Sequence, residues 1–166
     1  NAQNGGAGDM LVSNFNKTDL SLMWAVDNCV GNCTTAQEWG YYLSSDTNGD
    51  IYAAGHFYYD EMGFDFGTGS VQLANEGLYD IAIWKLSKDG ISINANSLAS
   101  DYMDVLVGLE VVNDHVIVAG IFTGQGSLDS ARNLYGSSLL ISLELDLSTR
   151  WVSGIGLDAE GSEPSI

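Results

Sequence analysis

Hydrophobic and polar residues alternate with a period of two along most of this chain. In YDIAIWKL (79–86), Ile81 and Ile83 would point to one side of a strand and Trp84 to the other. In SLLISLELDLS (138–148), leucine and isoleucine recur at every second position, with serine, glutamate and aspartate between them. Successive side chains of a β-strand point to opposite faces, so this pattern predicts strands. Three further segments rich in β-branched and aromatic residues are also expected to be strands: 9–16, 50–59 and 111–122.

Turn signals separate these segments. The dipeptides Asn48-Gly49 and Asp89-Gly90 favour tight hairpins, and Asn113-Asp114 marks another turn. The best window for an amphipathic helix, 100–112, fits a strand at least as well. We therefore expect an all-β fold.

The chain also repeats itself internally. Segment 8–24 aligns without gaps with the segment that begins at Tyr79, so that Asp9 falls on Asp80 at an offset of 71 positions. A third copy, SSLLISLELDLSTRWV (137–152), follows at an offset of about 58. The alignment predicts that the same pair of strands occurs three times.

A second element recurs between these copies. The string Ala-Gly-x-Phe ends one expected strand at 54–57 and another at 119–122. The alternation of strand pairs with Ala-Gly-x-Phe strands defines a unit of roughly sixty residues and four strands, which is the size and content of a β-propeller blade.

Two strings in the central part of the chain match a known repeat. SSDTNGDIYAAGHF (44–57) is similar to the motif D-x-x-G-N-x-Y-x-x-G-x-F, and FDFGTGSVQLANEGLYDIAIWKLSKDG (64–90) to its continuation D-F-G…L…G-x-D-x-F-x-x-K-L-x-x-x-G. These motifs belong to the bacterial-type β-propeller repeat known as SBBP, which the chain therefore resembles. Asp50 replaces the family's usual asparagine, and Ile83 replaces its phenylalanine.

The second unit resembles the family more loosely. It keeps the Ala-Gly-x-Phe strand, but Ser138 replaces the aspartate and the Lys-Leu pair is missing. The resemblance implies a multi-bladed propeller, usually in a secreted or cell-surface protein, and it brings no catalytic residues.

The repeats divide the chain into a partial propeller of about two to three blades built from four-stranded antiparallel sheets. We expect the end of one blade and a connection at 1–40, a complete blade at 41–96, a degenerate blade at 97–153, and a tail or the start of another blade at 154–166. Propellers close with about four to eight blades, and open strand edges invite pairing. We therefore expect further blades of the same protein, or protein partners, to bind these edges.

Charge excludes two classes of partner. The 166 residues carry 5 basic and 22 acidic side chains, a formal net charge of −17. Such a surface repels nucleic acid and anionic lipid. No stretch approaches the length of an apolar transmembrane helix, so membrane insertion is not expected.

The cysteines and sequons favour an oxidising, extracellular or cell-surface setting. Cys29 and Cys33 are close enough in CVGNC for a local disulfide, although two free thiols are the alternative. Asn16 and Asn32 each begin an N-x-S/T sequon at an expected turn, so both are candidates for glycosylation.

One turn has the composition of a metal site. Asp46, Asn48 and Asp50 present oxygen ligands at alternate positions around Gly49, as the start of a calcium loop does. The glutamate that would complete such a loop is absent, since Phe57 occupies its position. The alternative is an ordinary hairpin turn, and no other cofactor is expected.

Acidic residues near His56 offer a further candidate. Asp60, Glu61 and Asp65 follow the first Ala-Gly-x-Phe strand and could supply a carboxylate pair for acid–base chemistry. A solvated loop on an acidic protein explains them equally simply. No nucleophile, zinc-protease or phosphate-binding motif is present, so we do not expect an enzyme.

The aromatic residues suggest packing and contact roles. Trp24 and Trp151 lie at comparable places in the repeat, and Trp84 would face away from Ile81 and Ile83, so we expect most of the tryptophans to lie in the core. The expected exposed aromatic residues are tyrosines, at positions 41, 42, 58 and 59.

Together these patterns predict a non-enzymatic, extracellular structural or interaction module, part of a larger protein or surface assembly. The first alternative is a calcium-assisted adhesion or carbohydrate-binding module that uses the Asp46 turn and nearby tyrosines. A second alternative is a piece of a propeller enzyme whose catalytic residues lie in other blades.

Overall fold

The computed structural model describes residues 9–28, 37–58, 61–124 and 137–155. Every regular element within these ranges is a β-strand, which confirms the all-β prediction. The strands are β1 (Leu11–Phe15), β2 (Leu22–Asp27), β3 (Gln37–Ser45), β4 (Ile51–Tyr58), β5 (Met62–Asp65), β6 (Ser70–Leu73), β7 (Tyr79–Leu86), β8 (Ser92–Leu98), β9 (Asp104–Val112), β10 (His115–Phe122), β11 (Ser137–Glu144) and β12 (Thr149–Ile155). In these ranges, no helix has the length and hydropathy needed to cross a bilayer.

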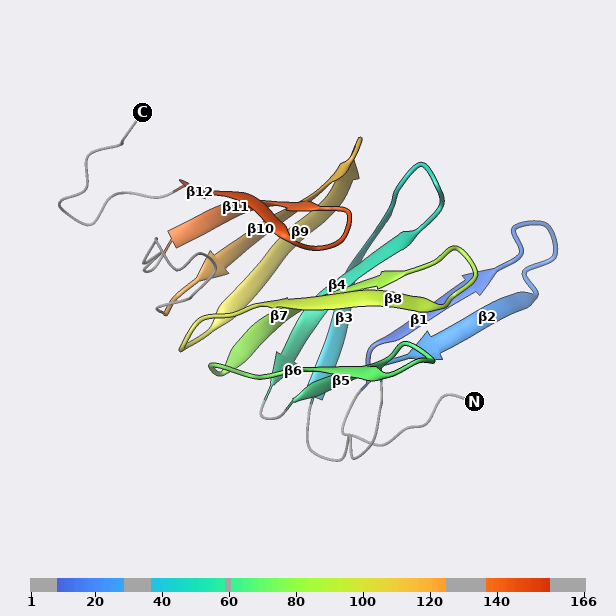
Figure 1. The fold of residues 1–166 in the computed structure, drawn as a ribbon, viewed down its shortest axis with the longest axis horizontal. Coiled ribbons are helices and arrows are strands. Elements are labelled where there is room, and N and C mark those ends of the chain that lie inside the picture. The colour runs from blue at the N-terminus through green and yellow to red at the C-terminus, as the bar shows by residue number, and fades with distance from the viewer. Residues whose placement is uncertain (1–8, 29–36, 59–60, 125–136, 156–166) are drawn as a thin grey trace.

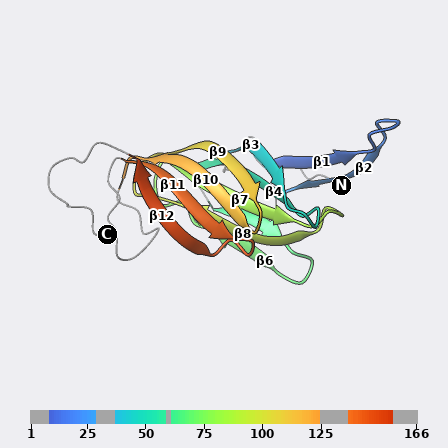
Figure 2. The ribbon, with the colours of Figure 1, turned by 90° about the horizontal axis from the view of Figure 1, so that it is seen from above.

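The strands form two four-stranded antiparallel sheets and two hairpins. The first sheet has the order β3-β4-β7-β8, and the second has the order β9-β10-β11-β12. The β1–β2 hairpin and the second sheet lie at opposite ends of the molecule, with the first sheet between them (Figures 1 and 2). The β5–β6 hairpin is inserted between β4 and β7. No ring closure occurs among the described strands, which form a row of sheets.

The two sheets are copies of one another in strand register. Ala54 of β4 is opposite Ile83 of β7, and the equivalent Ala119 of β10 is opposite Leu140 of β11. Equivalent positions of β7 and β11 are therefore 57 residues apart, one fewer than the sequence alignment indicated.

Irregularities in the strands recur as well. An extra residue interrupts the pairing of β3 with β4 at Tyr41, and another interrupts the pairing of β9 with β10 at Val107. The last two strands of each sheet, which we call the outer pair, share a second register shift. It lies at Lys85/Leu86 in the β7–β8 pair and at Ser142/Leu143 in the β11–β12 pair. Shared bulges indicate that each unit bends at the same two places.

Two hydrophobic cores lie between these layers. The first lies between the two sheets and includes Ile81 and Ile83 of β7. The second lies between the first sheet and the two hairpins and includes Trp84. Both faces of β7 are therefore buried, each against a different neighbour, so this segment is apolar at most positions and not only at every second one.

The prediction that most tryptophans lie in the core is wrong. Only Trp84 is fully buried, whereas Trp24 is half-buried and Trp39 and Trp151 have exposed fractions of 38% and 41%. Trp84 lies on a central strand with layers on both sides, whereas Trp151 lies on an outer strand of the last described sheet. The face of β12 that carries Trp151 is exposed because no other sheet among the described residues packs against it.

The turns of the three outer strand pairs each contain one residue in the left-handed conformation near their end, although the β1–β2 turn is one residue longer than the other two. Leu20, Gly90 and Leu147 occupy the same turn position and have positive φ angles of 58°, 79° and 69°. In each case the backbone N–H donates to a carbonyl earlier in the turn. Leucine is strained in this left-handed region, which glycine adopts readily.

Leu20→Gly is therefore expected to stabilise the protein by up to about 1 kcal/mol, because it relieves backbone strain at a side chain with an exposed fraction of 74%. Leu147→Gly makes the same backbone change but removes a buried side chain, so we expect a loss of about 1–3 kcal/mol. Urea denaturation of both variants measures the two values. Equal effects in the two variants would contradict the burial difference between the turns.

Candidate functional site

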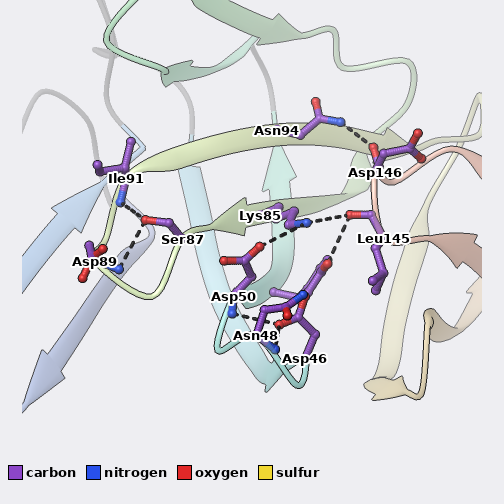
Figure 3. A network of polar contacts seen from close by, with 11 residues as sticks. Asp46, Asn48, Asp50, Lys85, Ser87, Asp89, Ile91, Asn94, Leu145 and Asp146 are labelled. Carbon is purple, nitrogen blue, oxygen red and sulfur yellow. Dashed lines mark hydrogen bonds and ion pairs between the residues drawn. The ribbon is translucent and has the colours of Figure 1, made fainter.

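The predicted calcium turn connects β3 to β4 and is held by its own side chains. Asp46 Oδ1 accepts hydrogen bonds from the backbone N–H groups of Asn48 and Asp50, both at 2.9 Å. Gly49 supplies the positive φ angle, at 86°. Ser87 makes the same arrangement in the β7–β8 turn, where its Oγ accepts from the N–H groups of Asp89 and Ile91 (Figure 3). The turn geometry therefore follows from backbone capping at both places.

The Asp46 turn also connects the two sheets. Asp50 Oδ2 lies 3.4 Å from Lys85 Nζ, and Lys85 Nζ donates to the carbonyl oxygen of Leu145 in the second sheet at 3.0 Å. The Tyr52 hydroxyl donates to the same carbonyl at 3.1 Å (Figure 3). Asp50 thus balances the charge of a lysine that spans the junction. Among the described residues, no group of three or more histidine, cysteine, aspartate or glutamate side chains is arranged to hold a metal ion.

Other predicted sites lie partly outside the described residues. Cys29, Asn32 and Cys33 fall in the undescribed range 29–36, and Asp60 falls in 59–60. Asn16 lies in the β1–β2 turn, where its Oδ1 accepts from the Thr18 N–H at 2.8 Å. Its place in a turn matches the expectation for a glycosylation candidate.

Of the candidate acid–base residues, His56 and Asp65 lie on opposite sides of the first sheet. His56 points toward the second sheet, where its Nε2 accepts from the Leu106 N–H at 2.6 Å. Asp65 accepts from the Gly67 N–H in the turn of the β5–β6 hairpin. That hairpin packs on the opposite face of the first sheet, in the core that contains Trp84. The contacts of Asp65 are those of a turn cap.

A pair of buried carboxyl groups lies at the junction of the two sheets. Asp80, near the start of β7, and Asp104, the first residue of β9, are both fully buried, and each lies close enough to affect the pKa of the other. Asp104 also accepts from the N–H and the hydroxyl of Ser100. Burial raises the pKa of Asp80 and, together with the nearby Asp80 charge, raises the pKa of Asp104 to about 7. The pair therefore shares a proton in mildly acidic solution.

The junction before the first sheet has a matching pair. Glu38 is buried at the start of β3, and burial, together with the charge of Asp9, raises its pKa to about 7. Asn28 connects this pair to the backbone, because its side chain hydrogen-bonds to Glu38 and its Oδ1 accepts from the Met10 N–H at 2.7 Å. Asp9 and Asp80 are the residues that the sequence repeat had aligned.

Glu38 and Asp104 were missed by the sequence analysis. They lie directly opposite Phe57 and Phe122, the last residues of the two Ala-Gly-x-Phe strings. The sequence feature that marks them is an acidic residue at the start of β3 and of β9, the strands that come directly before the two Ala-Gly-x-Phe strands. It could be found only with the strand register, because the β3–β4 and β9–β10 connections differ in length.

An aromatic pocket opens beside the second of these junctions. It has a volume of about 280 Å³ and is lined by Trp39, Tyr41, His56, Tyr79, Met103, Asp104 and Val105. The ring centroids of Trp39 and Tyr79 are 5.9 Å apart, and Tyr58 stacks on Tyr79 at 4.5 Å. Tyr41 and His56 make an edge-to-face contact, with their ring centroids 4.9 Å apart. These aromatic residues come from β3, β4 and β7.

The lining of this pocket has no cationic side chain near neutral pH, and its one carboxyl group, that of Asp104, is fully buried. Burial lowers the pKa of His56, so its ring is uncharged. Because Nε2 accepts the Leu106 N–H, the proton of the neutral ring lies on Nδ1. The carboxyl group of Asp104 is fully buried and accepts hydrogen bonds from the backbone N–H and the hydroxyl of Ser100. We refer to the seven lining residues as the aromatic pocket.

The outer strands make a repeated contact with the following unit. Three residues on β2, β8 and β12 are equivalent: Trp24, Asn94 and Trp151. Each pairs with the last residue before the register shift between its strand and the preceding one. Trp24 Nε1 donates to the carbonyl oxygen of Lys88 in the next unit at 3.1 Å, and Asn94 Nδ2 donates to that of Asp146. This confirms the prediction that Trp24 and Trp151 occupy comparable places. The described residues contain no following unit for Trp151.

No family model matches this chain, and no curated protein matches it significantly.

Proposed function

We propose that this chain is a non-enzymatic structural and interaction module, a segment of an SBBP-type β-propeller that acts outside the cell or on its surface. In this proposal it belongs to a larger protein or surface assembly. Its sheets form a rigid row, and further blades or protein partners bind at the ends of the row and at its open strand edges. Its acidic surface keeps it away from nucleic acid and anionic membranes.

The observation that carries the proposal is the repeated junction. At each one, a side chain of an outer strand donates to a turn carbonyl of the next unit: Trp24 to Lys88 and Asn94 to Asp146. Each junction also buries a carboxyl pair. Both contacts therefore join an outer strand to a turn of the next unit, with the acceptor one turn position later in the second case, and the same two elements can serve for a third unit.

Both ends of the row expose apolar side chains. On the second sheet, Val112, Ile121 and Trp151 point away from the core between the sheets, and all three are exposed. On the β1–β2 hairpin, Leu11 and Phe15 are exposed on the face opposite the buried Val12. Exposed apolar faces of this kind mark interaction surfaces. We therefore propose that partners pack against these end faces as well as pairing with the open strand edges.

Size-exclusion chromatography with light scattering tests the proposal on the 166-residue chain. We expect self-association that increases with protein concentration, because the exposed faces bind one another when no other partner is present. Trp151→Glu should weaken this association, because it places a charge in the centre of one end face.

Ile91→Glu is the matched control. Ile91 is also exposed, but it lies in the β7–β8 turn and not on an end face. We expect it to leave association unchanged. A monodisperse monomer at every concentration would contradict the proposal, as would equal effects of the two substitutions.

A further inference from the structure

The aromatic pocket has the properties of a binding site that the proposed scaffold role does not use. It lies at the junction of the two sheets, and its rings come from segments that the sequence separates by up to 40 residues, from Trp39 to Tyr79. Trp39 and Tyr41 remain accessible, with exposed fractions of 38% and 56%. Aromatic side chains that converge without being buried leave their faces available to a ligand.

We propose that the aromatic pocket binds a pyranose ring of a neutral glycan. A pyranose has an apolar face of C–H groups and an edge of hydroxyl groups. The faces of Trp39 and Tyr79 suit the C–H groups, because an aromatic face carries partial negative charge. The tyrosine hydroxyls and the Nδ1–H of His56 are polar groups that can bond to sugar hydroxyls.

The size of the pocket fits one ring. Its volume of about 280 Å³ lies just below the roughly 300 Å³ at which pockets begin to take drug-sized ligands. A single sugar unit is therefore the natural occupant, with any adjoining units of the glycan extending into solvent. A site of this size and openness binds a monosaccharide weakly, with a millimolar dissociation constant.

The lining offers no accessible charged group for a salt bridge, which favours a sugar over a charged ligand. His56 is uncharged, and the carboxyl group of Asp104 is fully buried and bonded to Ser100. A quaternary ammonium ion would need several ring faces turned toward one point. One face of Tyr79 is instead covered by the stacked ring of Tyr58.

This inference does not rest on the proposed stacking of units. The pocket is formed within the chain, between the first and second sheets, whereas the exposed faces expected to cause self-association lie at the two ends of the row. Trp39→Ala is expected to abolish sugar binding and leave self-association unchanged. Trp151→Glu is expected to do the reverse, so the failure of one proposal can be distinguished from the failure of the other.

Saturation-transfer NMR on the full chain tests the inference directly. The probes are the methyl pyranosides of glucose, galactose, mannose and N-acetylglucosamine, each at millimolar concentration. We expect at least one of them to receive saturation, most strongly at the C–H protons that face the rings. Titration of that sugar should also shift the tryptophan fluorescence, because Trp39 lines the pocket.

Three variants assign the signal to the aromatic pocket. Trp39→Ala should weaken binding at least about tenfold, whereas Trp39→Phe should retain part of it, because a ring face remains. Trp151→Ala is the matched control, since Trp151 is an equally exposed tryptophan outside the pocket. Thermal unfolding of each variant verifies that the fold is kept.

Three results would overturn the inference. The first is the absence of saturation transfer to all four sugars. The second is an equal loss of binding in Trp39→Ala and Trp151→Ala. The third is binding of tetramethylammonium, and of no sugar, in a manner that depends on Trp39, which would identify a cation site.

Discussion

Trp84→Ala is expected to lower the free energy of unfolding by about 3–5 kcal/mol, the largest stability effect of any single substitution considered for this protein. Trp84 is fully buried, and its ring centroid lies 5.2 Å from that of Phe64. It fills the core where the first sheet meets both hairpins, so its removal leaves a cavity that three layers border. Urea denaturation followed by circular dichroism measures the loss.

Trp84→Phe keeps the effect measurable if the alanine variant does not fold. The indole Nε1 of Trp84 has no hydrogen-bond partner among the described residues, so phenylalanine removes a buried, unsatisfied donor. This gain offsets part of the lost volume, and we expect a net cost of about 1 kcal/mol. Trp151→Ala, at an exposed position, should change stability by no more than about 0.5 kcal/mol. Similar costs at positions 84 and 151 would contradict the layered arrangement.

The faces of β7 could be predicted from the sequence because both are buried. Ile81 and Ile83 alternate with Trp84, and each set packs into a different core. The repeat was visible for the same reason, since equivalent strands must fill equivalent spaces between sheets. The match of Asp9 with Asp80 followed from it, and both residues belong to buried carboxyl pairs.

The exposure of Trp39 and Trp151 could not be predicted in this way. A strand pattern shows which residues share a face, but not whether another layer covers that face. Trp151 is equivalent to Trp24, yet only Trp24 has a following unit among the described residues to contact. Burial at such positions depends on the number of layers, which is a property of the assembly and not of the strand.

The aromatic pocket depends on register as well as on pattern. Trp39 lies opposite His56, and His56 lies opposite Ile81, two residues from Tyr79. The bulge at Tyr41 shifts the pairing by one residue and turns its ring to the edge of His56. The sequence did indicate that Tyr41 and Tyr58 would be accessible, but it could not place them beside Trp39 or His56. A one-residue bulge changes which side chains meet, and the sequence contains no reliable signal for it.

The stability of the protein is expected to rise as the pH falls from about 7 toward 4. Asp104→Asn should remove the part of this rise that Asp104 contributes, while Glu38, whose pKa is also raised to about 7, contributes another part. The pKa of Asp104 is about 7 in the folded protein and 3.8 in the unfolded reference. The folded state therefore binds the proton more tightly than the unfolded chain does. The resulting stabilisation is complete below pH 3.8 and is lost as the pH rises through about 7.

The expected size of the effect is a few kcal/mol, because each unit of pKa difference corresponds to about 1.4 kcal/mol. Asparagine has nearly the shape of aspartate, can donate to Asp80, and carries no charge at any pH. Asp104→Asn should therefore be at least as stable as the unmodified protein above pH 7, where the unmodified pair holds an unfavourable buried charge. Denaturant unfolding at a series of pH values measures both profiles.

The net charge of −17 adds a pH dependence of the same sign, because protonation relieves repulsion throughout the molecule. Asp89→Asn controls for it, since Asp89 is exposed in the β7–β8 turn and contributes only to the general charge. Its profile should remain parallel to that of the unmodified protein, whereas that of Asp104→Asn should be flatter. Parallel profiles for all three proteins would show that the buried pair does not share a proton. The junction between the sheets would then have to accommodate two charged carboxylates without any protonation, which a fully buried Asp80 and Asp104 could do only at a large cost in desolvation.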